Sequence, residues 1–189
     1  MRQDHLTRTT DPTTTDHSIR ATASALVHSH DLDDFKFSKG ETDPRGWDVM
    51  TVQGAKVGKV ADLLVDTRAG RVRYVEVAVD RDVAKRAKRD YVLVPVGTAR
   101  LDEERDDVIV DLSATELAEI PIYDRKLVSR DYEQSLRSYL HGRSAGADTG
   151  GGTESTDQDF YADAYYDDRS FFGARRRRGR ESGPADRSV

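Results

Sequence analysis

The sequence contains no cysteine. The chain therefore forms no disulfide, offers no thiolate to a metal ion and has no thiol nucleophile. Histidine is also scarce where a core is expected: four of the five lie within the first 30 residues, and the fifth is His141. The valine-rich middle of the chain thus lacks the base that Ser-His-Asp catalysis requires. These two absences exclude several classes of enzyme.

Long apolar runs are missing as well. No run approaches the roughly 18 residues that a membrane-spanning helix needs, and the N-terminus lacks the basic-then-apolar pattern of a secretory signal. We therefore expect a cytoplasmic chain with no transmembrane segment. Hydrophobic residues make up 36% and charged residues 34% of the sequence. Such a composition favours one compact domain with extended polar ends.

Recognisable cofactor and catalytic motifs are lacking too. The sequence has neither a P-loop nor a dinucleotide glycine pattern at the start of a helix. Carboxylates are frequent near the ends of the expected strands, but acid–base catalysis needs two of them in different environments inside a cleft. We therefore predict no catalytic residue, no cofactor and no enzymatic activity.

Short valine-rich stretches, separated by glycine-containing turns, fill the region from Gly46 to Leu112. With no long helical pattern between them, they are typical of a small antiparallel barrel or sandwich. Apolar residues occur on both faces of the two longest stretches, so both faces must be covered. We expect a mainly β fold, a six-stranded barrel within residues 38–125, with strands at 46–50, 56–66, 71–80, 91–96, 99–102 and 107–112.

Residues 1–37 are predicted to be a flexible arm, because they are rich in Thr, Asp and His and poor in large apolar side chains. A small apolar patch around Leu26 is compatible with a brief docked helix. His28 and His30 raise the question of a metal site, although a closed site needs three or four ligands. The simpler interpretation is a solvated arm, and no metal ligand is assigned.

Two helices are expected after the strands. Ser113 and Glu116 have the spacing of a capping box, which starts a short helix that Pro121 ends. A second, amphipathic helix is predicted at 126–141. Its apolar stripe packs either in the core of the same chain or against a second copy in a homodimer, and consists of Tyr132, Leu136, Tyr139 and Leu140.

Two charged regions are candidate partner-binding elements. The first follows the third expected strand and is either a solvated loop or a patch for phosphate or an acidic partner; its basic residues are Arg81, Lys85, Arg86, Lys88 and Arg89. The second lies in residues 142–189, which we predict to be a disordered tail. One interpretation is an interaction element that docks on a folded protein, an anionic surface or nucleic acid; the other is a basic cluster that docks on the acidic part of the same tail. The residues of this second region are Tyr165, Tyr166, Phe171, Phe172, Arg175, Arg176, Arg177 and Arg178.

Several motifs in fixed order resemble the PRC-barrel family. They are Gly46-Trp47-Asp48-Val49, then Gly58-Lys59-Val60-Ala61-Asp62-Leu63-Leu64-Val65-Asp66, then Gly70-Arg71-Val72-Arg73-Tyr74 and Val94-Pro95-Val96-Gly97. The family is named for the cytoplasmic domain of the photosynthetic reaction-centre H subunit and includes the C-terminal domain of a bacterial ribosome-maturation factor. The Leu101-Asp102 hairpin and the segment from Leu117 to Tyr123-Asp124 are similar to the stand-alone bacterial members.

The resemblance covers roughly residues 37–139 and implies a six-stranded PRC-type barrel with C-terminal helical additions. It implies an adaptor or assembly module without a catalytic constellation. Our preferred hypothesis is a non-catalytic, dimeric adaptor that binds a protein. The alternative is a nucleic-acid-associated protein, RNA-processing or ribosome-related, that uses the basic loop and the Arg-rich tail. A stress-associated role is conjecture from architecture. A photosynthetic role is disfavoured because the N-terminal transmembrane helix of the H subunit is missing.

Overall fold

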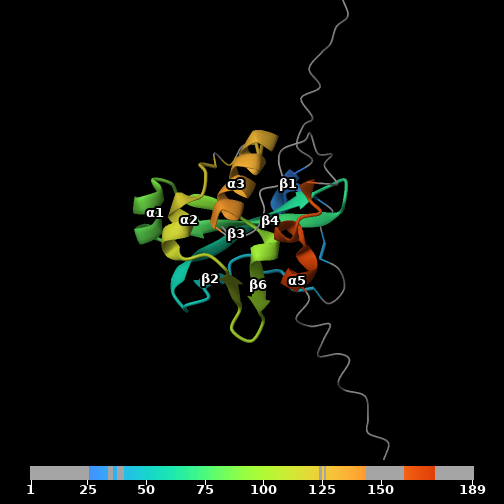
Figure 1. Cartoon of the computed structure of the whole chain (residues 1–189). Coiled ribbons are helices and arrows are strands. Elements are labelled where there is room, and N and C mark those ends of the chain that lie inside the picture. The colour runs from blue at the N-terminus through green and yellow to red at the C-terminus, as the bar shows by residue number, and fades with distance from the viewer. Residues whose placement is uncertain are drawn as a thin grey trace, which may run out of the picture.

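The computed structural model describes residues 26–33, 36–37, 41–123, 125, 127–143 and 160–172. Within them a seven-stranded sheet has the order β5-β4-β3-β2-β7-β6, with β1 paired to β3 beside this path (Figure 1). The mainly β prediction is confirmed, and each of the six expected strands is present. The strands are β1 (Leu26–His28), β2 (Asp48–Thr51), β3 (Lys56–Asp66), β4 (Arg71–Val79), β5 (Tyr91–Pro95), β6 (Ala99–Asp102) and β7 (Asp107–Val110).

Strand β3 is the central element of the sheet. Its 11 residues pair with β4 along one side, and with both β2 and β1 along the other. The register with β4 shifts between Val60 and Asp62 and again between Leu64 and Val65. A bulge changes which face the following side chains occupy. Asp62, Leu63 and Leu64 nevertheless follow one another without a shift and are all buried, so both faces of this part of β3 are covered.

The sheet is open in the described part of the chain. Strands β5 and β6 end the path and do not pair with each other, and the 3-10 helix η2 (Val96–Thr98) joins them. The expected closed barrel is therefore not confirmed. Apolar side chains from outside the strands complete the core, among them Leu136, Leu140, Tyr166 and Phe171.

The N-terminal arm and the first basic region differ from expectation. Leu26–His28 is a strand of the sheet, not a solvated arm or a helix. The region expected to be a loop contains α1 (Arg81–Ala87), because Val83 and Ala87, four residues apart, form one buried side of a helical turn. Figure 1 shows α1 next to α2 (Ala114–Glu119), against which it packs.

The two predicted C-terminal helices are present. Ser113 caps α2 by accepting a hydrogen bond from the Glu116 amide, while the Glu116 carboxylate accepts one from the Ser113 amide. In α3 (Arg130–Arg143), Leu136 and Leu140 are fully buried. The stripe of α3 therefore packs in the core of its own chain. Dimerisation through another surface stays a prediction.

A part of the predicted tail is folded onto the domain. It comprises Phe160, the 3-10 helix η3 (Ala164–Tyr166) and α5 (Asp168–Phe172), which lies beside β6 (Figure 1). We call residues 160–172 the aromatic segment. Arg175, Arg176, Arg177 and Arg178 lie outside the described residues. The helices in the described part of the chain are too short or too polar to cross a bilayer.

Substituting Gly58 tests the packing of the two longest strands. A Cβ atom at this position would lie 2.3 Å from the Ala78 carbonyl oxygen and 3.0 Å from Val77 Cγ1. Since backbone must shift to admit it, we expect Gly58→Ala to lower the free energy of unfolding by about 1–3 kcal/mol, measured by urea denaturation. Gly142→Ala is the matched control because a Cβ there meets open space. Equal stability of the two variants would contradict this account of β3 and β4.

Candidate protein-interaction site

The basic residues predicted around α1 divide into two groups. Arg86 NH1 donates a hydrogen bond to Thr115 Oγ1 at 3.1 Å, and Arg89 NH2 donates one to the Ala118 carbonyl oxygen at 3.0 Å. Both side chains thus hold α1 against α2. Arg81, Lys85 and Lys88 make no such contact with α2 and are exposed; Arg86 is exposed as well, and Arg89 is half-buried. The structure does not gather all five on one free surface.

The aromatic residues of the predicted disordered tail, which we expected to be exposed candidates for partner binding, are placed differently. Tyr166 and Phe171 are completely buried, while Tyr165 and Phe172 are half-buried. The prediction of exposure was wrong for the first two because the domain offers them an apolar surface to cover. The Tyr166 ring meets Tyr74 of β4 edge to face, with 5.6 Å between centroids.

Cationic side chains stack on the rings of the aromatic segment. The Arg73 guanidinium lies 4.3 Å from the centroid of the Tyr161 ring, and the Arg130 guanidinium lies 4.4 Å from that of Phe160. Such cation–π contacts are strongest where water is excluded. Phe160 itself is 2% exposed, so these contacts form at a buried interface between the segment and the domain.

Buried polar groups also join the segment to the domain. The hydroxyls of Tyr74 and Tyr161 both donate to Glu133 Oε1 of α3, the first at 2.8 Å. Burial raises the pKa of Glu133 despite these donors. Arg73 NH1 donates to the Tyr166 carbonyl oxygen at 3.3 Å, while its NH2 pairs with Asp66 at 3.2 Å. The domain therefore satisfies both a side chain and the backbone of the segment.

Gly97 permits the closest approach of the segment to the domain. A Cβ atom on this residue would lie 2.0 Å from the Ala164 carbonyl oxygen and 2.7 Å from the Tyr165 carbonyl carbon. Backbone of η3 thus occupies the space that any other side chain needs. We define the segment-binding surface by Arg71, Arg73, Tyr74, Gly97 and Glu133.

These domain-side residues were not identified from the sequence. Four of them belong to the motifs Gly70-Arg71-Val72-Arg73-Tyr74 and Val94-Pro95-Val96-Gly97, which indicated a fold and not a binding surface. Arg73 is 8% exposed, whereas an arginine in an expected strand is normally a solvated residue. A buried arginine beside a buried tyrosine is the feature that marks the surface, and only the structure shows it.

An open pocket of about 370 Å³ lies beside the segment-binding surface. Strand residues and residues of the aromatic segment both line it. Ile109 and Arg100, which are cross-strand partners on β7 and β6, are among the strand residues. The residues that line it are Val52, Gly97, Thr98, Ala99, Arg100, Ile109, Asp111, Ala164, Tyr165 and Ser170.

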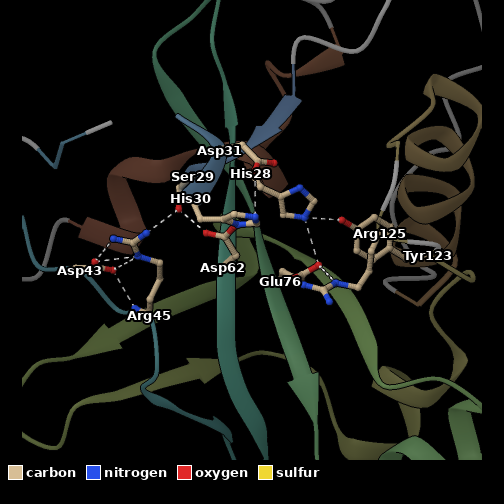
Figure 2. Close-up of polar contacts among 10 residues, drawn as sticks. All are labelled: His28, Ser29, His30, Asp31, Asp43, Arg45, Asp62, Glu76, Tyr123 and Arg125. Carbon is tan, nitrogen blue, oxygen red and sulfur yellow. Dashed lines mark hydrogen bonds and ion pairs between the residues drawn. The ribbon is translucent and has the colours of Figure 1, made fainter. Parts of the chain in front are cut away.

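A separate polar cluster surrounds β1 (Figure 2). It contains two buried carboxylates, Asp62 and Glu76, which are cross-strand partners on β3 and β4. Arg125 binds Glu76 through two hydrogen bonds, Nε to Oε1 at 2.9 Å and NH2 to Oε2 at 3.0 Å. The His28 Nε2 atom lies 3.3 Å from Glu76 Oε1 and 3.0 Å from the Tyr123 hydroxyl.

Each pKa in this pair follows from the contact. The hydrogen bond to Glu76 raises the pKa of His28 against the opposing effect of burial. Burial alone would raise the pKa of Glu76, but the hydrogen bonds from His28 and Arg125 outweigh it and lower this pKa. The imidazolium and the carboxylate therefore stabilise each other's charged form.

Asp62 is held in a similar way from the N-terminal side. The Ser29 hydroxyl donates a hydrogen bond to it, and His30 Nδ1 contacts its other oxygen (Figure 2). Arg45 NH1 in turn donates to Ser29 Oγ at 3.4 Å. No group of three or more side chains suited to a metal ion occurs in the described residues. His28 and His30 instead fasten β1 to the sheet.

These features describe a class of protein: a small β domain that holds a distant aromatic segment of its own chain. Residues 40–117 match the family model of the PRC-barrel domain, so the chain carries a PRC-barrel domain, as the motifs indicated. The match spans β2 to the middle of α2 and includes Arg71, Arg73, Tyr74 and Gly97. Glu133 and the aromatic segment lie outside it. A domain of this family points to a role in protein interaction or assembly.

The ion pair between His28 and Glu76 predicts a pH-dependent stability. The pKa of His28 is raised from 6.5 in the folded chain, so its contribution is complete below about pH 6.5 and is lost as the pH rises through the folded-state value. We expect His28→Gln to lower the free energy of unfolding by about 1.5–3 kcal/mol near pH 6 and by less at pH 9, in urea titrations.

Glu76→Gln provides the matched background for this measurement. Without the carboxylate, the destabilisation by His28→Gln should no longer become smaller between pH 6 and pH 9, because the partner that raises the imidazole pKa is gone and burial, which lowers it, remains. If His28→Gln lowers the free energy of unfolding of the otherwise native chain by as much at pH 9 as at pH 6, the charged pair does not hold β1.

Proposed function

We propose that this chain is a non-catalytic adaptor that binds a protein partner through its PRC-barrel domain. The observation that carries the proposal is the aromatic segment itself. The domain binds a stretch that begins at Phe160, far beyond the end of the matched range at residue 117, and buries its rings. The folded domain is thus able to recognise a short peptide segment.

The segment-binding surface has the chemistry that protein interfaces use. Aromatic residues and arginine are enriched at interface centres because they combine large buried area with specific geometry. Here Tyr74 supplies the aromatic contact, Arg73 stacks on a ring and donates to a backbone carbonyl, and Glu133 accepts from a tyrosine hydroxyl. These contacts support protein binding more directly than a reaction.

The polar cluster around β1 supports a non-catalytic role. A general base must lie within hydrogen-bond reach of a substrate proton. His28 is instead engaged with Glu76 and Tyr123, and Glu76 is engaged with Arg125. The polar contacts of each of these groups lie inside the protein. These contacts hold β1 and Arg125 against the sheet.

Nucleic-acid binding remains the alternative prediction. The described residues favour it less, because Arg86 and Arg89 are engaged with α2 and the exposed Asp82 and Asp90 interrupt the basic stretch. Association into a homodimer, a stress role and any photosynthetic connection likewise stay untested predictions.

Photo-crosslinking in the source cells tests the adaptor function. A photoreactive residue replaces Arg100, which is exposed and lines the pocket beside Gly97, or Arg81, which is exposed on α1. We expect a discrete protein adduct from position 100 and none from position 81 after irradiation. The control is the same chain without irradiation.

The two positions also separate the alternatives. One outcome would support nucleic-acid binding in place of the adaptor function. It is the formation of nucleic-acid adducts at position 81 that are lost when irradiation is done at high salt, with no protein adduct at position 100. Absence of adducts at both positions would overturn the proposed binding surface.

A further inference from the structure

The aromatic segment contacts the domain as a ligand contacts a receptor. Sixteen residues, 144–159, connect Arg143 at the end of α3 to Phe160, and they are rich in Gly, Ser, Thr and Asp. Yet α3 and the aromatic segment, which this connection joins, lie next to each other, since Tyr165 donates a hydrogen bond to the Leu140 carbonyl oxygen at 3.3 Å. The connection is much longer than this short gap requires. Its length therefore allows the segment to leave the surface while the chain stays connected.

Three aromatic rings anchor the segment. Phe160, Tyr166 and Phe171 are at most 2% exposed and follow one another at spacings of six and five residues. The first two rings also contact each other, with 5.2 Å between centroids. Burial of these rings provides the apolar part of the recognition.

Acidic residues between the anchors contact basic side chains of the domain. Asp163 Oδ2 lies 2.9 Å from His141 Nε2 and 3.4 Å from Arg137 Nε, both on α3. Asp168 Oδ1 lies 2.5 Å from Arg71 NH1 on β4. His141 and Arg71 are partly exposed, so water screens these pairs and they contribute to specificity more than to affinity.

Gly97 selects for backbone at the centre of the surface. Because a Cβ there would overlap the Ala164 carbonyl oxygen, an occupant must pass its main chain directly over this residue. Arg73 donates to the Tyr166 carbonyl oxygen close by. The surface therefore recognises a bent peptide backbone in addition to side chains.

From these contacts we propose that the segment-binding surface takes an aromatic–acidic segment of a separate partner protein, and that residues 160–172 are its internal competitor. The inference rests on the proposed function and names the chemistry of the partner. The partner presents large aromatic residues spaced like Phe160, Tyr166 and Phe171, with carboxylates between them for α3 and Arg71. A tethered competitor acts at millimolar effective concentration, so the adaptor binds only partners that overcome it.

A synthetic fluorescent peptide with the sequence of residues 159–173 tests the proposal on full-length chains. In the variant Phe160→Ser/Phe171→Ser the internal segment loses two anchors, while the residues that define the segment-binding surface are unchanged. We expect this variant to bind the peptide about 100-fold more tightly than the native chain does, because the competitor is weakened. Adding Gly97→Ala should abolish binding, whereas adding the control Gly142→Ala, where a Cβ meets open space, should not.

A charge reversal gives a second test that does not remove buried rings. Arg71 is 38% exposed at its side chain, so Arg71→Asp leaves the core intact. We expect the Arg71→Asp chain to prefer a peptide carrying Asp168→Arg over the native peptide, and the native chain to show the opposite preference. Far-UV circular dichroism and thermal unfolding establish that each variant is folded.

Each outcome decides the proposal. No binding by the folded anchor variant, or binding that Gly97→Ala leaves unchanged, overturns it. Self-association of the native chain in analytical ultracentrifugation that Gly97→Ala abolishes would assign the surface to a second copy and would also overturn it. Protein adducts at position 100 without peptide binding would leave the adaptor function standing and refute only the partner chemistry.

Discussion

The buried pair of carboxylates on the two longest strands is the constraint around which the N-terminal half is built. Asp62 and Glu76 face each other across β3 and β4 and are almost completely buried. Two like charges in such a place are costly unless donors compensate them. His28, Ser29 and Arg125 provide these donors. His28 and Ser29 precede the PRC-barrel domain and Arg125 follows it. The chain on both sides of the domain is thus fixed to the sheet, because the two buried carboxylates need these hydrogen bonds.

The same logic applies to the apolar side of the open sheet. Strands β5 and β6 do not close on each other, so Tyr74 and its neighbours need a cover from outside the strands. Helix α3 supplies Leu136 and Leu140, and the aromatic segment supplies Tyr166 and Phe171. The core is therefore completed by chain that lies beyond the matched residues 40–117. Fold completion and peptide binding take place at one surface.

The sequence predicted what local patterns decide. Alternating valines and turns placed six strands, and the capping box at Ser113 placed α2. Strand β1 was missed because three residues carry no periodicity, and contacts to Glu76 and Asp62, more than 30 positions away, hold it. The burial of Tyr166 was missed for a similar reason: its neighbours in sequence are acidic and polar, and its partner Tyr74 is distant. Open or closed sheet geometry also depends on such long-range contacts.

Arg73 shows why the segment-binding surface needs an occupant. Its guanidinium is buried, pairs with Asp66, stacks on Tyr161 and donates to the Tyr166 carbonyl oxygen. Without the aromatic segment, two of these three contacts disappear, and the ring of Tyr74 loses its cover. Water can replace the hydrogen bonds but not the apolar contact. The surface is therefore more stable occupied than empty. An external segment gains affinity by restoring the contacts of Arg73 and Tyr74 that the internal segment now makes.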